Sequence, residues 1–177
     1  MKIIDHSVLK SIIKSKTLFR IGGLDIGSKY VGVAVSDETR TFSSPLKRDI
    51  IRKNSSNLDE SYQSFSHQLQ KVVEEHRIYF LVIGLPIYQG KLTPLGNEIF
   101  KMISSIEIPL SIPRSGASLP QELCCTFWDE YNTSNEARAM SAQLTQRRNI
   151  IQKQKDGLAA AIILDSFIRF INLPSPS

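Results

Sequence analysis

The stretch that decides the fold is "IGGLDIGSKYVGVAVSD", residues 21–37, which holds two apolar runs and a glycine between them. Each run has the length and composition of a β-strand, and Gly27-Ser28 is a two-residue hairpin signal. The first run contains one acid, Asp25. A carboxylate within a buried strand is costly unless it is paired, hydrogen-bonded or bound to a metal ion. The rest of the chain therefore has to supply a partner for Asp25.

Three further strands are expected outside this hairpin. "TRTFSSPLKR", residues 39–48, resembles a strand that ends near Pro45. Ile78–Gly84 is a short apolar run bounded by glycine, and "LCCTFW", residues 123–128, is a second one; both are typical of strands buried on both faces. The segment "LPIYQGKLTP", residues 85–94, is expected to be a loop.

Helical patterns separate the later strands. Apolar residues at helical spacing predict an amphipathic helix over about residues 57–76. Thr93 and Pro94 are suited to the N-cap and first position of a short helix. "TSNE", residues 133–136, has capping-box spacing and predicts a helix to about Gln146. "DGLAAAIILDSFIRFI", which opens at Asp156, is apolar nearly all round and predicts a deeply buried helix.

This order of elements predicts an α/β fold. Strands joined by hairpins are antiparallel, whereas strands separated by helices are parallel to their neighbours. We therefore expect a five-stranded mixed sheet with helices on both faces. The 177 residues fit one domain, which we place at 19–172, with an N-terminal extension at 1–18 and a tail at 173–177.

The N-terminal extension has two interpretations. Val8, Leu9, Ile12 and Ile13 share one helical face, with Lys10 and Lys14 opposite, which predicts a short amphipathic helix packed on the domain. Its basic, serine-containing composition also fits an organelle transit peptide. The sequence leaves both open, so we expect an intracellular, cytoplasmic protein with organelle import as the alternative.

Bulk composition narrows the class of protein. No apolar run approaches the ~20 residues of a membrane helix, so we expect no membrane partner. The net charge of +5 favours a polyanionic partner only slightly. Cys124 and Cys125 are adjacent, so on a strand they point to opposite faces and form neither a disulfide nor a zinc site. A reducing, intracellular environment follows.

Carboxylates occur at the ends of several predicted elements: Asp25 on the first strand, Asp129 and Glu130 after the last strand, and Asp156 at the last helix. In a layered α/β fold these ends can converge at one edge of the sheet. Acids gathered there repel one another unless a divalent cation neutralises them, and such hard oxygen ligands suit Mg²⁺ or Mn²⁺. Each acid also has a structural reading, as a turn residue, a strand end or, for Asp156, an N-cap.

Several motifs of the sequence resemble those of one known family. "GLDIGSKYVGVAVSD", "SSPL", "FLVIGLP", "FWDEYNTSNEA" and "KDGLAAAIILDSFI" occur in the order and spacing of the YqgF-like family, over about residues 19–171. Members of that family are named as Holliday junction resolvases or pre-16S rRNA nucleases. The resemblance implies a ribonuclease H-like fold, which agrees with the predicted order of strands and helices.

The resemblance also implies roles for single residues. Asp25 matches the acid of the family's first-strand motif, Asp129 and Glu130 match its Asp-Glu pair, and Asp156 matches the acid of its C-terminal helix. The implied activity is a metal-dependent nuclease in which these acids bind Mg²⁺ or Mn²⁺. The chain departs from the family at Tyr131, where an arginine is usual, and in a longer segment at 108–121.

Three functions are compared on this basis. The first is a metal-dependent nuclease on structured RNA or branched DNA, with phosphates contacted by basic residues: Lys29, Arg147, Arg148, Lys153 and Lys155. The second is a catalytically weakened or inactive nucleic-acid-binding module of the same fold, which Tyr131 favours. The third is a phosphotransferase that uses the "GLDIG" turn to bind ATP. It ranks low, because a chain of this length lacks the second domain with which such kinases enclose the nucleotide. The oligomeric state stays open, with a homodimer as one option.

Overall fold

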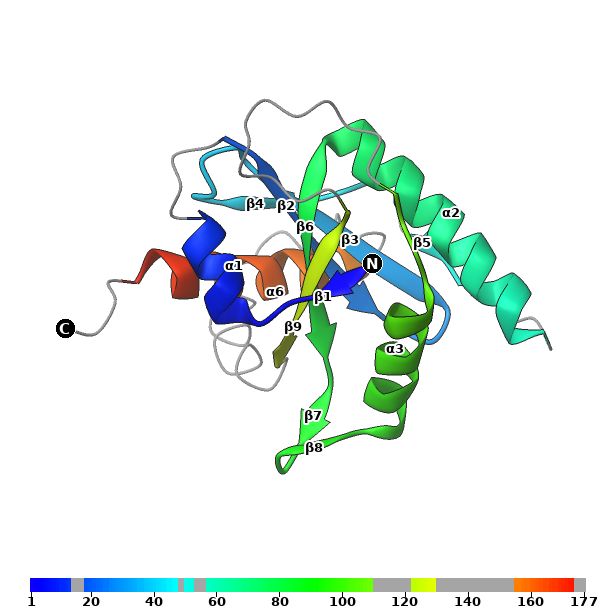
Figure 1. Ribbon diagram of the computed structural model, residues 1–177. Coiled ribbons are helices and arrows are strands. Elements are labelled where there is room, and N and C mark those ends of the chain that lie inside the picture. The colour runs from blue at the N-terminus through cyan, green and yellow to red at the C-terminus, as the bar shows by residue number, and fades with distance from the viewer. Residues whose placement is uncertain (14–17, 48–49, 53–56, 110–121, 130–154, 174–177) are drawn as a thin grey trace.

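The computed structural model describes residues 1–13, 18–47, 50–52, 57–109, 122–129 and 155–173, with only the backbone of Ile13, Lys155 and Asp156 (Figure 1). A single mixed sheet runs through the centre of the molecule. The predictions that fall between these ranges, including the helix predicted over residues 133–146, lie outside the described residues.

The predicted hairpin forms the middle of the sheet. Strand β2 (Arg20–Ile26) pairs antiparallel with β3 (Tyr30–Ser36), and Asp25 lies opposite Gly32. The Gly27 N–H donates to the carbonyl of Tyr30 at 3.0 Å. The two turn residues are therefore Ser28 and Lys29, one position later than the sequence predicted, because Gly27 still pairs across the hairpin.

The remaining three predicted strands are confirmed. Strand β4 (Ser43–Pro45) pairs antiparallel with β3. Strand β6 (Ile78–Leu85), buried along its whole length, lies parallel to β2, and β9 (Cys124–Asp129) lies parallel to β6. Cys124 and Cys125 are free and buried in β9, as expected, and burial raises the pKa of the Cys125 thiol to about 12.

Two short strands enlarge the sheet beyond the five predicted. Strand β1 (Lys2–Ile3) pairs parallel with β9, and β5 (Ile50–Ile51) pairs with β3. Among the described residues the sheet thus has seven strands, in the order β1-β9-β6-β2-β3-β4 with β5 beside β3. A two-residue strand is too short to show an alternating pattern, so neither strand could be predicted from its own residues.

The helices match their predicted positions. Helix α2 (Leu58–His76) is capped by Asn57, whose side chain accepts the Asp59 N–H at 3.1 Å. Helix α3 (Pro94–Ser105) is capped by Thr93, whose hydroxyl accepts the Gly96 N–H at 3.1 Å. The long C-terminal helix α6 spans Lys155–Asn172, and the N-terminal helix α1 spans His6–Ile13.

Ring contacts on β9 show which helices cover which face of the sheet. Phe127 packs against Phe100 of α3 at 5.4 Å between ring centroids, and the next residue, Trp128, packs against Phe167 of α6 at 5.3 Å. Successive strand residues point to opposite faces, so α3 and α6 lie on opposite sides of the sheet. The expected covering of both faces is confirmed.

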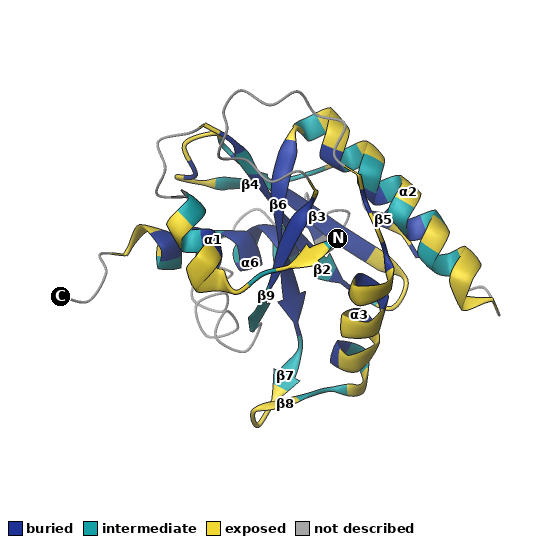
Figure 2. Cartoon of the chain, viewed as in Figure 1, coloured by how far each residue is buried: buried dark blue, intermediate teal, exposed yellow. Residues whose placement is uncertain are grey.

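The N-terminal segment packs on the domain. Leu9 of α1 is fully buried, and the Met1 amino group donates to the Ile106 carbonyl at 2.9 Å. Figure 2 shows that α1 carries both exposed and half-buried residues. The ring of His6 lies 5.3 Å from that of Phe170, which places α1 beside α6. The amphipathic helix predicted for this segment is confirmed. Within the described ranges, no helix has the length and hydropathy needed to cross a membrane.

The predicted loop at residues 85–94 is instead a small hairpin. Strands β7 (Ile87–Tyr88) and β8 (Lys91–Leu92) pair antiparallel. Gln89 and Gly90 between them have φ values of 49° and 72°, the left-handed backbone of a tight two-residue turn. The hairpin extends from the carboxyl end of β6 (Figure 1). "QG" satisfies this turn chemistry, but its flanking strands are too short to be recognised by alternation.

Candidate active site

Asp25 faces the helix α6 from the central strand. Gly23, two residues earlier on β2, lies so close to α6 that a Cβ there would be 2.7 Å from the Ala160 carbonyl oxygen and 2.8 Å from Leu164 Cβ. Residues two apart on a strand share a face, so Asp25 is on the α6 side of the sheet. Its side chain is half-buried.

The first turn of α6 lies over the same part of the sheet. A Cβ on Gly157 would be 3.1 Å from the Leu46 carbonyl oxygen and 3.7 Å from that of Val33. Asp156 precedes Gly157 and stands one helical turn before Ala160, the residue that closely approaches Gly23. Asp156 lies within α6 as described, Lys155–Asn172, so the alternative reading of this acid as an N-cap does not hold.

Asp129 ends β9 at the same edge of the sheet. The register aligns Leu24 with Ile83, Ile83 with Phe127 and Leu85 with Asp129. Only β6 therefore separates the strands that carry Asp25 and Asp129. The usual strand spacing puts the backbones at these two residues about 10 Å apart. Trp128 faces α6, so strand alternation turns Asp129 toward the opposite face. Asp25 and Asp129 thus share an edge but not a face, and Glu130 lies outside the described residues.

The predicted group of four acids remains a prediction. Among the residues whose side chains are described, no three His, Cys, Asp or Glu residues are grouped closely enough to hold a metal ion. Lys29 lies exposed in the β2–β3 turn, with its Nζ 5.3 Å from the Tyr30 ring centroid. Arg147, Arg148 and Lys153 are outside the described ranges, and Lys155 contributes only its backbone.

Arg52 is a residue near the site that the sequence analysis missed. It is 9% exposed, and its Nη1 donates to the Gly27 carbonyl at 2.8 Å. Its Nη2 bonds the carboxylate of Glu98 on α3, and its backbone N–H donates to the Lys29 carbonyl at 2.9 Å. Arg52 thus fastens the hairpin that carries Asp25 to α3. In "IIRKNSSN" it reads as an ordinary surface charge, and no motif distinguishes it.

Asp37, the other acid of the opening stretch, is structural. Its carboxylate accepts the backbone N–H groups of Thr39, Thr41 and Phe42 and both threonine hydroxyls. Burial by itself would raise the pKa of Asp37, but these hydrogen bonds, led by that of Phe42, outweigh it and hold the pKa well below its usual range. Asp37 therefore orders the turn between β3 and β4.

The strand order agrees with the ribonuclease H-like fold that the resemblance implies: the central strand β2 has one antiparallel and one parallel neighbour, and it carries an acid on the side of the C-terminal helix. The chain belongs to the RuvX family: the model of that family, described as Holliday junction resolvase, matches residues 19–169. Members of the family are nucleases, which hydrolyse phosphodiester bonds, and enzymes of this kind generally use divalent metal ions.

Curated relatives support this assignment along most of the chain. A Listeria innocua protein named "Putative pre-16S rRNA nuclease" is 31% identical over 154 residues, which covers 86% of this chain and 99% of the relative. A protein of the same name from Thermoanaerobacter pseudethanolicus is 27% identical and covers 84% of this chain and 95% of the relative.

A solved structure is also similar to this chain, though distantly. The structure of T. thermophilus RuvC in complex with Holliday junction substrate matches with a TM-score of 0.49 and 13% identity, and covers 90% of this chain and 99% of that one.

Proposed function

We propose that this chain is a divalent-metal-dependent nuclease that cleaves structured nucleic acid, either precursor 16S rRNA or a four-way DNA junction. The observation that carries the proposal is the placement of Asp25 on the α6 face of β2, beside the helical turn that contains Asp156. Family membership supplies the reaction class, and the names of the relatives and of the family supply the two substrates.

The proposed metal ligands are Asp25, Glu130 and Asp156, with Asp129 as a weaker candidate. The donor set fits Mg²⁺ or Mn²⁺, because both ions prefer carboxylate oxygens. When bound, such ions stabilise the charge that develops on the attacking and leaving oxygens in phosphodiester hydrolysis. Asp129 ranks behind the others because strand alternation turns it away from the face that Asp25 occupies.

Residues of the chain itself would position the substrate. Lys29 lies exposed in the turn that follows Asp25, which supports the proposal that its ammonium group contacts a phosphate near the metal site. Arg52 holds that turn through the Gly27 and Lys29 carbonyls. We propose Arg147, Arg148, Lys153 and Lys155 as further phosphate contacts on the basis of sequence alone.

A second candidate function is a nucleic-acid-binding module with weak or no catalysis. Tyr131 stands where the family usually has arginine, and tyrosine cannot replace the charge or the bidentate hydrogen bonds of a guanidinium. Cleavage separates the two candidates, because both bind nucleic acid but only the nuclease shortens it.

The test is a cleavage assay on a panel of structured RNAs, including a precursor 16S rRNA, and four-way DNA junctions. We expect cleavage of one class in millimolar Mg²⁺ or Mn²⁺ and none in EDTA. Asp25→Asn should lower the rate at least ~100-fold. Glu75→Gln removes an exposed carboxylate of α2 and should leave the rate unchanged. Binding without cleavage of any substrate by the wild type would favour the second candidate.

The proposed substrates have consequences for the cellular compartment and the oligomeric state of the protein. Either nucleic acid places the enzyme inside the cell, in the cytoplasm or in an organelle that holds nucleic acid. Paired cuts across a four-way junction would suit a homodimer, because a two-fold axis presents two equivalent sites. Sedimentation with and without the junction tests the dimer.

A further inference from the structure

An aromatic cavity lies next to the candidate active site. It has a volume of about 350 Å³ and is lined by residues that include His6, Ile87, Phe127, Trp128, Asp129 and Phe170. These residues come from α1, the β7–β8 hairpin, β9 and α6. Asp129 lines this cavity and ends β9 at the sheet edge where Asp25 lies, so the cavity is close to the candidate active site.

The rings of the cavity form one packed cluster. Trp128 lies edge-on to Phe167 at 5.3 Å and tilted to Phe170 at 5.2 Å between centroids. His6 is edge-on to Trp128 at 6.1 Å. The indole N–H of Trp128 donates to the Ser166 hydroxyl at 3.3 Å, which fixes the ring. Trp128 is nevertheless only half-buried, so a fixed aromatic ring borders an open cavity.

The lining chemistry indicates which part of a nucleic acid the cavity fits. None of the described residues that line it is Lys or Arg, and Asp129 would repel a phosphate. Aromatic rings stack on the faces of nucleobases, and a carboxylate accepts hydrogen bonds from their amino groups. A base paired in a helix cannot present its faces, so the occupant must be unpaired.

We propose that this cavity receives one unpaired nucleobase of the substrate beside the cleavage site. The proposal rests on the nuclease function proposed above and narrows the substrate to nucleic acid with an unpaired or extruded nucleotide near the cut. His6 gives the N-terminal segment a part in substrate binding, since α1 supplies one of the rings. Leu85, which is buried, also lines the cavity.

The first test uses the tryptophan itself. Trp128 is the single tryptophan in the sequence, so its fluorescence reports on the cavity without a label. We expect saturable quenching by an RNA or DNA hairpin with a one-nucleotide bulge. The same hairpin with an abasic residue in the bulge should quench several-fold less. Equal quenching by both hairpins would overturn the proposal. So would an emission change that depends only on protein concentration, because it would mean that a second copy of this chain occupies the cavity.

The second test measures affinity by anisotropy at fixed salt, in the Asp25→Asn background so that no substrate is cut. Removing the bulged base should weaken binding of the otherwise unaltered protein about tenfold, which corresponds to ~1.4 kcal/mol. With His6→Ala or Trp128→Leu, abasic substitution should cost less than threefold, whereas Trp128→Phe should restore most of the difference. An unchanged tenfold penalty in His6→Ala and Trp128→Leu would contradict the assignment.

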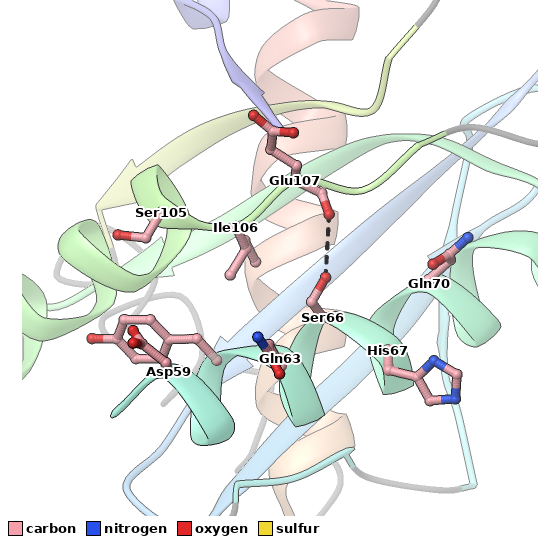
Figure 3. Close-up of a pocket in the computed structure, with 9 residues that line it drawn as sticks. Asp59, Gln63, Ser66, His67, Gln70, Ser105, Ile106 and Glu107 are labelled. Atoms are coloured by element: carbon pink, nitrogen blue, oxygen red, sulfur yellow. Dashed lines mark hydrogen bonds between the residues drawn. The ribbon is translucent and has the colours of Figure 1, made fainter. Parts of the chain in front are cut away.

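A matched control comes from the other large cavity. That cavity, about 420 Å³, lies between α2 and residues 105–107, and its lining is polar (Figure 3). Ser66 donates to the Glu107 carbonyl there at 3.3 Å. His67→Ala removes an exposed histidine from this cavity, and it should keep the full abasic penalty. Loss of the penalty in His67→Ala as well would overturn the proposal.

The outcomes distinguish this inference from the proposed function. If the wild type cleaves but binds no more tightly to a substrate with an unpaired base, the nuclease assignment stands and the assignment of the cavity to a base is wrong. If no substrate is cleaved in any metal while the bulged base still quenches Trp128, the cavity is supported and catalysis fails.

Discussion

At the scale of the residue, the position of Asp25 on β2 is explained by the helix α6, which packs on the same face of the strand. Gly23 lets the backbone of β2 approach α6 closely, and Asp25, on the same face, lies further along toward the first turn of that helix. A side chain at position 23 would hold the helix away. The glycine therefore sets the distance between the two elements that carry Asp25 and Asp156.

Replacing this glycine should be costly. Gly23→Ala puts a Cβ 2.7 Å from the Ala160 carbonyl oxygen, a backbone atom that cannot move alone, so we expect a loss of about 1–3 kcal/mol in unfolding free energy. Gly22→Ala is the matched control, because its Cβ would meet the ends of the flexible Leu81 and Ile78 side chains. Urea unfolding measures both, and equal losses would refute the close packing of β2 on α6.

At the scale of the element, the turn after β3 depends on Asp37. Its depressed pKa means that its contribution to stability is complete above the ordinary carboxyl value of 3.8 and is lost progressively as the pH falls below it. Asp37→Ala should therefore cost about 1–3 kcal/mol at pH 7 and less at pH 3. Unfolding midpoints at both pH values test this. Glu38→Ala, which removes an exposed ion pair with Arg20, should change little.

The bridge from the β2–β3 turn to α3 gives a second test at this scale. Arg52→Ala leaves the half-buried Gly27 carbonyl without this donor, so we expect a loss of about 1–2 kcal/mol and slower cleavage, since the turn follows Asp25 directly. Glu98→Gln retains a hydrogen-bond acceptor at a half-exposed position and should cost less than about 0.5 kcal/mol. Equal effects in chemical denaturation would mean that the ion pair, not the carbonyl contact, is what matters.

Elements with clear periodicity or capping could be predicted from the sequence, and the shortest ones could not. The runs at Ile78–Gly84 and 123–128 and the cap Thr93 follow from local chemistry, and the structure has them. Strands β1, β5, β7 and β8 contain two residues each. Pairing with a neighbour, rather than their own pattern, makes them strands, and a single sequence does not display that pairing.

At the scale of the whole molecule, the N-terminal segment is part of the folded unit. Strand β1 extends the sheet beside β9, and α1 buries Leu9 and contributes His6 to the aromatic cavity. The sequence predicted the helix, but its amphipathic pattern does not reveal which surface it covers.

A pair of substitutions tests whether α1 and the domain unfold together. Leu9→Ala removes a fully buried side chain and should lower the unfolding free energy of the whole domain by about 2–4 kcal/mol. Val8→Ala, at a position 49% exposed on the same helix, should cost less than about 0.5 kcal/mol. A Leu9→Ala melting curve that matches the wild type would show that α1 contributes nothing to the domain.

The candidate site could be predicted only in part, because its geometry depends on contacts between segments distant in sequence. Resemblance selected Asp25, Asp129, Glu130 and Asp156, but the sequence did not show that Asp129 and Asp25 occupy opposite faces, since this depends on the register of β9 with β6 and β2. Arg52 and the aromatic cavity were not foreseen, because both depend on contacts between segments distant in sequence.

The central claim is that Asp25 is a metal ligand of a nuclease, and metal-linked melting measured beside cleavage tests it most directly. Millimolar Mg²⁺ or Mn²⁺ should raise the melting temperature of the wild type, because an ion that binds only the folded state stabilises it. Asp25→Asn should lose both this increase and the cleavage of the preferred substrate, while Glu75→Gln keeps both. A wild-type melting temperature indifferent to metal, together with undiminished cleavage by Asp25→Asn, would contradict the account.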